Sequence, residues 1–255
     1  MNRRKFIAFN LAILTTACTN KKQHKIDLTI SAASSVQDAM KDIRVLYRKE
    51  TPNVNINYNF GSSGSLQQQI EQGAPTDVFL SAAPKQMNAL QRKKLLLTET
   101  RQDLLKNRIV LITLKETVNN VTFNNLNKAE FKKVALGDPA SVPAGQYGKE
   151  VLSSLELYKK IDSKLVFGKN TRQILFYVET GNVDAGLVYE TDVRVSDKVK
   201  IVDIAPESYH SPIIYPISVI RQSKHPEEAK KFTEFLFSEK VKNVFKNYGF
   251  SLVKD

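Results

Sequence analysis

Three short segments of this chain place hydroxyl-bearing and very small residues between an apolar run and the start of a helical pattern. They are residues 30–36, 60–66 and 137–147 (ISAASSV, FGSSGSL and GDPASVPAGQY). Serine is a common helix N-cap, so ordinary capping explains any one of them taken alone. Glycine and alanine beside the serines let an anion approach backbone N–H groups closely, and each helix N-terminus carries about +0.5 charge equivalent. If they converge, these segments could bind an oxyanion without Lys or Arg.

Residues suited to catalysis or metal ligation are scarce. The three histidines, His24, His210 and His225, lack ligand spacing and are predicted to be surface residues. The single cysteine, Cys18, leaves no His/Cys metal cluster. Residues 61–65 (GSSGS) are neither a Gly-x-Ser-x-Gly elbow nor a P-loop with its Gly-Lys-Ser/Thr ending. The chain is therefore predicted to bind a ligand, to need no cofactor and not to be an enzyme.

The chain is basic, with 38 Lys and Arg against 26 Asp and Glu in 255 residues and a formal net charge of +12. Residues 1–17 hold three basic residues and no acid, which leaves +9 for a chain that starts at Cys18. The remaining basic residues are scattered among acids, without the basic and aromatic patterns of nucleic-acid binders. The charge is therefore interpreted mainly as a solvated basic surface rather than a nucleic-acid site, and it would also steer an anion at long range.

The N-terminus has the pattern of an export signal. Residues 1–17 join a basic start to an apolar run that is too short to span a bilayer. Residues 14–18 (LTTAC) resemble a bacterial lipobox, although Thr15 stands where leucine is usual. We expect a signal peptide over 1–17, lipidation of Cys18, and a polar, basic tether over 18–25. The alternative for Cys18 is an incidental thiol near a cleavage site.

Strand and helix patterns alternate through the rest of the chain. This alternation favours an α/β fold with parallel sheets covered on both faces, where ligands bind beyond the carboxyl ends of strands. A long amphipathic helical region is expected over 229–248, and Pro216 indicates an edge or bend. The expected strands are 26–30, 54–60, 77–80, 109–113, 134–137, 185–189 and 213–220.

Five motifs, in this order, resemble the periplasmic molybdate-binding protein family. The resemblance covers residues 26–252 and rests on 32–36 (AASSV), 60–79 (FGSSGSL…QIEQGAPTDVF), 137–145 (GDP…VPAG), 186–189 (GLVY) and 245–250 (FKNYGF). It implies a type II periplasmic-binding-protein fold with two lobes, each a mostly parallel sheet flanked by helices. The ligand would lie in the cleft between them. Lobe 1 would comprise 26–106 and 216–255, and lobe 2 would comprise 107–215.

The resemblance also implies a function. The family supplies the substrate-binding component of an ABC importer, so we expect a monomer that binds molybdate and tungstate outside the cytoplasmic membrane. It would be lipid-anchored at the periplasmic face or cell surface and deliver its ligand to a permease. Receptors for sulfate or another small oxyanion, and an exported enzyme or adhesin, remain alternatives.

Five residues of the chain match the family's oxyanion-binding positions. Ser35, Ser63 and Tyr189 would donate through hydroxyls, and Ala144 and Thr171 through backbone N–H groups. Molybdenum would be held only as molybdate, with no direct metal ligands. Thr171 stands where valine is familiar in the family, and Ser34 competes with Ser35 because a one-residue shift would exchange them.

Overall fold

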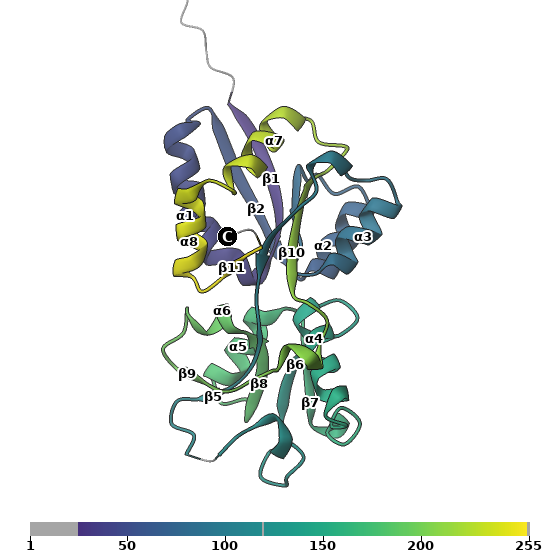
Figure 1. The fold of residues 1–255 in the computed structure, drawn as a ribbon, viewed down its shortest axis with the longest axis vertical. Coiled ribbons are helices and arrows are strands. Elements are labelled where there is room, and N and C mark those ends of the chain that lie inside the picture. The colour runs from purple at the N-terminus through teal and green to yellow at the C-terminus, as the bar shows by residue number, and fades with distance from the viewer. Residues whose placement is uncertain (1–24, 119, 254–255) are drawn as a thin grey trace, which may run out of the picture.

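The computed structural model describes residues 25–118 and 120–253, which form two lobes joined by extended segments (Figure 1). The predicted signal peptide, Cys18 and all of the predicted tether except Lys25 lie outside the described residues. Within the described ranges, no helix combines the length and the apolar character that a bilayer span requires.

The first lobe is built on a six-stranded sheet with the order β11-β4-β10-β3-β1-β2. Its helices pack on both faces, and α1 buries Ala39, Met40, Ile43 and Tyr47. The strands are β1 (Ile26–Ala33), β2 (Val54–Gly61), β3 (Val78–Leu80), β4 (Gln102–Lys106), β10 (Ile214–Val219) and β11 (Ser251–Leu252). The helices are α1 (Gln37–Glu50), α2 (Ser63–Glu71), α3 (Pro84–Arg92), α7 (Pro226–Phe235) and α8 (Glu239–Asn247).

The second lobe is built on a five-stranded sheet with the order β7-β6-β8-β5-β9. Its strands are β5 (Ile109–Leu114), β6 (Val134–Gly137), β7 (Leu165–Gly168), β8 (Ala185–Tyr189) and β9 (Val199–Ile204). Its helices are α4 (Pro143–Ser154), α5 (Thr171–Glu179) and α6 (Glu190–Val193). Short 3-10 helices lie at η1 (Ser34–Val36), η2 (Thr98–Thr100), η3 (Phe123–Asn125), η4 (Asp162–Lys164) and η5 (Glu207–Tyr209).

The two-lobed α/β fold is confirmed, but both sheets are mixed rather than mostly parallel. Strand β1 pairs in parallel with β2 and β3, and β6 pairs in parallel with β7 and β8. The crossing strands β5 and β10 pair only in antiparallel fashion with their neighbours. The reason is that each crossing strand enters its lobe from the cleft, whereas the strands that precede the site end there.

All seven expected strands are present, with shifts of up to a few residues at their ends. The expected bend at Pro216 is confirmed by a register shift between Tyr215 and Pro216, inside the sheet rather than at its edge. The amphipathic C-terminal region is two helices, because α7 ends at Phe235 and α8 begins at Glu239. Strands β4, β7, β9 and β11 were not predicted.

Candidate functional site

A very small cavity lies between the lobes, with only about 10 Å³ of space open to a water-sized sphere. Its lining includes all five residues that the sequence marked, together with the competing Ser34. None of the lining residues is charged. They are Ala33, Ser34, Ser35, Gly61, Ser62, Ser63, Ala82, Val142, Pro143, Ala144, Thr171 and Tyr189.

Helix N-termini from both lobes reach this cavity. Helices α2, α4 and α5 begin at Ser63, Pro143 and Thr171, and η1 leads into α1 from Ser34. Each follows the end of a strand of a parallel pair. The first-turn N–H groups of a helix lack intrahelical partners and carry partial positive charge. The cavity therefore offers backbone donors, including those of Ala144 and Thr171, without a formal charge.

The two predicted serines are buried and each has a polar neighbour. The Ser63 hydroxyl oxygen accepts from the backbone N–H of Ala82 at 2.9 Å. Because that N–H can only donate, the hydrogen of Ser63 is free for another acceptor. The Ser35 hydroxyl lies 2.9 Å from the Tyr215 hydroxyl, and Ser34 lies 3.4 Å from the Thr171 hydroxyl. Both Ser34 and Ser35 also belong to the lining of the cavity.

Tyr189 and Thr171 present different groups to the site. Burial raises the pKa of the Tyr189 phenol well above its usual value, so the phenol stays a donor. Its hydroxyl donates to the carbonyl oxygen of Ala82 at 3.4 Å, and this long contact must be given up for the hydrogen to reach a ligand. The Thr171 hydroxyl donates to Oδ1 of Asp192 at 3.2 Å, which occupies its hydrogen. This leaves the backbone N–H as the donor group of Thr171 for a ligand, and the role that the resemblance implies for it stays a prediction.

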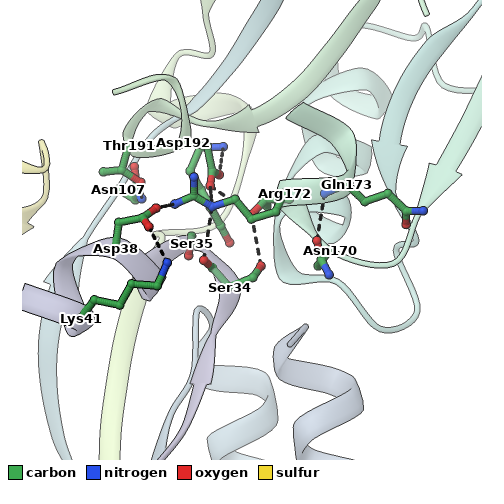
Figure 2. A network of polar contacts seen from close by, with 12 residues as sticks. Ser34, Ser35, Asp38, Lys41, Asn107, Asn170, Arg172, Gln173, Thr191 and Asp192 are labelled. Carbon is green, nitrogen blue, oxygen red and sulfur yellow. Dashed lines mark hydrogen bonds and ion pairs between the residues drawn. The ribbon is translucent and has the colours of Figure 1, made fainter. Parts of the chain in front are cut away.

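A polar network behind the cavity contains residues that the sequence did not mark (Figure 2). Arg172 joins the lobes: Nη2 lies 2.8 Å from Oδ2 of Asp38 on α1, and Nε lies 3.4 Å from Oδ1 of Asp192 on α6. Asp192 is fully buried and accepts from the backbone N–H of Tyr189 at 3.2 Å. Desolvation outweighs the attraction of Arg172 and raises the pKa of Asp192 to about 6.

One local signal could have located Asp192. It stands three residues after Tyr189, at the spacing of a capping residue in the first turn of α6. Tyr215 offers no such signal, because an aromatic residue in an apolar strand is ordinarily core. Its polar partner, Ser35, lies 180 positions away in the chain.

The lobes also touch directly beside the cavity. The backbone N–H of Gly64, in the first turn of α2, donates to the carbonyl of Ser141 at 2.9 Å. A Cβ at Gly64 would lie 2.4 Å from that carbonyl oxygen, so only glycine allows this approach.

No alternative metal or histidine site appears in the described residues. Within 25–118 and 120–253, no group of three or more His, Cys, Asp and Glu could hold a metal ion. His210 and His225 are half-buried rather than fully exposed, and the ring of His210 packs against Tyr147 at 6.0 Å. His24 lies outside the described residues.

Comparison with known sequences yields consistent relatives. The family model for bacterial extracellular solute-binding proteins matches residues 28–251. A Bacillus subtilis chain, YvgL, provisionally named an ABC transporter substrate-binding lipoprotein, is 47% identical over 96% of both chains. The molybdate-binding protein ModA of Haemophilus influenzae is 38% identical over 88% of this chain and 89% of its own. That of Escherichia coli is 36% identical over 88% and 89%.

Solved structures show the same fold. A Clostridium difficile substrate-binding domain, provisionally assigned to a molybdenum ABC transporter, is 46% identical with a TM-score of 0.70, covering 90% of this chain and 100% of its own. The Azotobacter vinelandii periplasmic molybdate-binding protein has a TM-score of 0.80 at 23% identity, over 89% and 100%. The Mycobacterium tuberculosis sulfate-binding protein SubI has a TM-score of 0.80 at 14% identity, over 90% and 88%, a likeness of fold alone.

Proposed function

The chain belongs to the ModA-type bacterial extracellular solute-binding proteins, a non-enzymatic family, and we propose that it binds molybdate and tungstate for an ABC importer. One observation carries the ligand class. Helix N-termini and hydroxyls from both lobes converge on a small cavity whose lining holds no charged residue. Such a site suits an anion that is bound by donors.

Molybdate and tungstate fit a site made of donors. Both are fully ionised tetrahedral dianions near neutral pH, so none of their oxygens carries a hydrogen that needs an acceptor. The proposed donors are the hydroxyls of Ser35, Ser63 and Tyr189 and the N–H groups of Ala144 and Thr171. Hydrogen phosphate would bring a proton into a cavity without a lining carboxylate. An unpaired buried donor costs about 1–3 kcal/mol, roughly one to two decades in affinity.

Sulfate is the competing ligand, because it too is a donor-only dianion and the sulfate-binding SubI has the same fold. Molybdate is favoured over sulfate by the names and identities of the ModA relatives, which exceed 30%. The chemistry of the donors does not separate the two ions, so the size of the closed cavity must do so.

The transport role follows from where the donors lie. Ser35 and Ser63 belong to the lobe of β1 and β2, whereas Ala144, Thr171 and Tyr189 belong to the lobe of β6 and β8. An anion that contacts both sets binds the closed form better than the open form and shifts the population toward closure. The closed, loaded protein would then dock on the permease, with lipidated Cys18 and the basic tether holding it at the membrane.

Isothermal titration calorimetry of the mature domain tests this proposal, with molybdate, tungstate, sulfate and phosphate as separate ligands. We expect saturable binding of molybdate and tungstate, and much weaker binding of phosphate. Tight sulfate binding without molybdate binding would show that the protein is a sulfate receptor instead. No heat and no thermal shift with either metal oxyanion would refute the proposal.

Replacing one serine tests the assignment of the donors. Ser63→Ala removes a hydroxyl that faces the cavity, and a hydrogen bond to a charged partner contributes about 1.5–3 kcal/mol. We expect the molybdate affinity to fall roughly tenfold to a hundredfold. Ser65→Ala is the matched control, because Ser65 lies in the same helical turn but outside the cavity lining. Equal affinities of the two variants would show that Ser63 is not a ligand.

A further inference from the structure

The hydroxyl of Ser35 can serve an oxyanion only if its hydrogen is free. Its neighbour, the Tyr215 hydroxyl, is 2.9 Å away, and either oxygen could donate to the other. If Ser35 donated to Tyr215, its single hydrogen would be used and its lone pairs would face the anion. The direction of this one hydrogen bond therefore decides whether Ser35 attracts or repels the ligand.

Asn107 favours one direction, because it occupies an acceptor site of the Tyr215 hydroxyl. Its Oδ1 accepts from the backbone N–H of Arg108 at 2.9 Å, and because that N–H can only donate, the amide cannot be flipped. Its Nδ2 therefore faces the Tyr215 hydroxyl at 3.2 Å and the Thr191 hydroxyl at 2.9 Å. Tyr215 accepts from this amide, so its own hydrogen is available for Ser35.

The surroundings keep Tyr215 in this state. Its side chain is fully buried in β10, and its ring packs against Tyr189 and Phe250 at centroid distances of 5.7 Å and 5.8 Å. Burial raises the pKa of the Tyr215 phenol, and this outweighs the lowering by the Asn107 amide that donates to it. The phenol remains protonated, and hence a donor, at every pH at which the protein would work.

On the premise of the proposed function, we infer that Tyr215 is a positioning residue: oriented by Asn107, it donates to Ser35 and so directs the Ser35 hydrogen at the anion. Ser63 reaches the same state through the N–H of Ala82. Both serines thus have an occupied acceptor side and a free hydrogen. Tyr215 acts on the ligand only through Ser35, and it does not line the cavity.

The link also ties the site to both crossings between the lobes. Asn107 lies between β4 and β5, where the chain leaves the first lobe, and Tyr215 lies in β10, where it returns. Thr191, the other partner of the amide, belongs to α6 of the second lobe. The free hydrogen of Ser35 therefore depends on the segments that carry Asn107, Thr191 and Tyr215. These segments contact one another in the arrangement of the lobes that this structure shows.

A double-mutant cycle on molybdate affinity tests the inference by calorimetry, with Tyr215→Phe, Ser35→Ala and the two combined. Tyr215→Phe removes one neutral hydrogen bond, for which we expect affinity to fall roughly threefold to tenfold. In the Ser35→Ala background the same change should have no further effect, because the group it orients is gone. Tyr147→Phe is the matched control, since Tyr147 is a buried tyrosine whose hydroxyl instead contacts the Pro212 carbonyl at 3.3 Å.

The outcomes separate this inference from the proposed function. A wild-type protein that binds no oxyanion overturns both. A wild type that binds, with Tyr215→Phe equal to Tyr147→Phe or with additive losses in the cycle, overturns the role of Tyr215 alone. Thermal unfolding of each variant without ligand shows whether it is folded. If Tyr215→Phe fails to fold, Asn107→Ala enters the same cycle, and its loss must likewise vanish in the Ser35→Ala background.

Discussion

Individual hydroxyls in this cleft owe their chemistry to what lies behind them. Ser63 accepts from a backbone N–H, Ser35 contacts a buried phenol, and Thr171 gives its hydrogen to Asp192. The resemblance assigned hydroxyls to Ser35 and Ser63 and a backbone N–H to Thr171, but it gave no reason for the difference. The contacts make two of them donors toward the cavity and leave the third with only its backbone N–H to offer.

The buried carboxyl of Asp192 makes the stability of the folded protein depend on pH. Its pKa is raised from 3.8 to about 6 by burial, so the folded protein holds this proton more tightly than the unfolded chain. Stability from this group is greatest below pH 4 and is lost as the pH rises through about 6. A pKa shift of about two units corresponds to roughly 3 kcal/mol in the free energy of unfolding.

Asp192→Asn should abolish that trend. We expect the stability of the variant relative to wild type, measured as the difference in unfolding free energy, to increase by about 1–3 kcal/mol between pH 4.5 and pH 7.5. Urea unfolding of the ligand-free proteins at the two pH values measures it. The lost contacts with Arg172 and Thr171 lower the variant's stability by an amount that changes little with pH, so only the difference between the two pH values is diagnostic. A difference that does not change with pH would contradict the raised pKa.

Among the elements, the helices that begin at the cavity place the donors. Strands β1, β2, β6 and β7 each end at the cleft, and a helix or 3-10 turn follows. The sheets bring the N-termini of these helices together. The geometry of the site therefore depends on how closely the loops before α2 and α4 approach each other.

The substitution Gly64→Ala tests whether binding requires this close approach of the two lobes. A Cβ there would lie 2.4 Å from the carbonyl oxygen of Ser141 in the other lobe, and backbone atoms cannot turn aside. Overpacking costs about 1–3 kcal/mol, so Gly64→Ala should weaken molybdate binding roughly tenfold while leaving thermal unfolding of the free protein little changed.

Gly145→Ala offers the contrast, because its Cβ would lie 2.0 Å from the Gly137 carbonyl within one lobe. We expect this variant to lose stability whether or not ligand is present. Calorimetry and thermal unfolding of both variants separate the two cases. Wild-type affinity for Gly64→Ala would show that the lobes bind ligand without this contact.

The strands were predictable to different extents. Apolar runs such as 109–113 and 134–137 are fully buried, and burial on both faces produces an apolar run that is visible in sequence. Strand β4 was missed because its two buried residues, Leu104 and Leu105, are adjacent rather than alternating. Strands β7 and β9 lie at sheet edges and are mostly only partly buried, so neither forms a continuous apolar run in the sequence.

At the scale of the whole molecule, the proposed function requires the two lobes to close on the ligand, and one ion pair lies across the cleft. Arg172 spans the cleft to Asp38, and both side chains are partly exposed, at 22% and 28%. A pair of this kind is worth about 0.2–1 kcal/mol and is weakened by salt.

Asp38→Asn should therefore weaken molybdate binding by roughly twofold to fivefold at low ionic strength, and by less at high salt. Glu227→Gln is the control, because the Glu227–Lys230 pair at 3.0 Å lies within α7, away from the cleft. Titrations at two salt concentrations measure the effect. Equal affinities of the two variants at low salt would exclude a role for the bridge in closure.

The residues of this chain indicated an oxyanion site built from helix starts and hydroxyls in three segments, and the resemblance to the molybdate-binding family supplied its five candidate positions. Glycines, serines and helix starts are local features, and each motif is contiguous in the chain. Folding decided which donors are free, because the deciding contacts are distant in sequence: Ser35 with Tyr215 across 180 positions, and Tyr215 with Asn107 across 108. A hydroxyl can donate or accept, and only its neighbours in space determine which of the two it does.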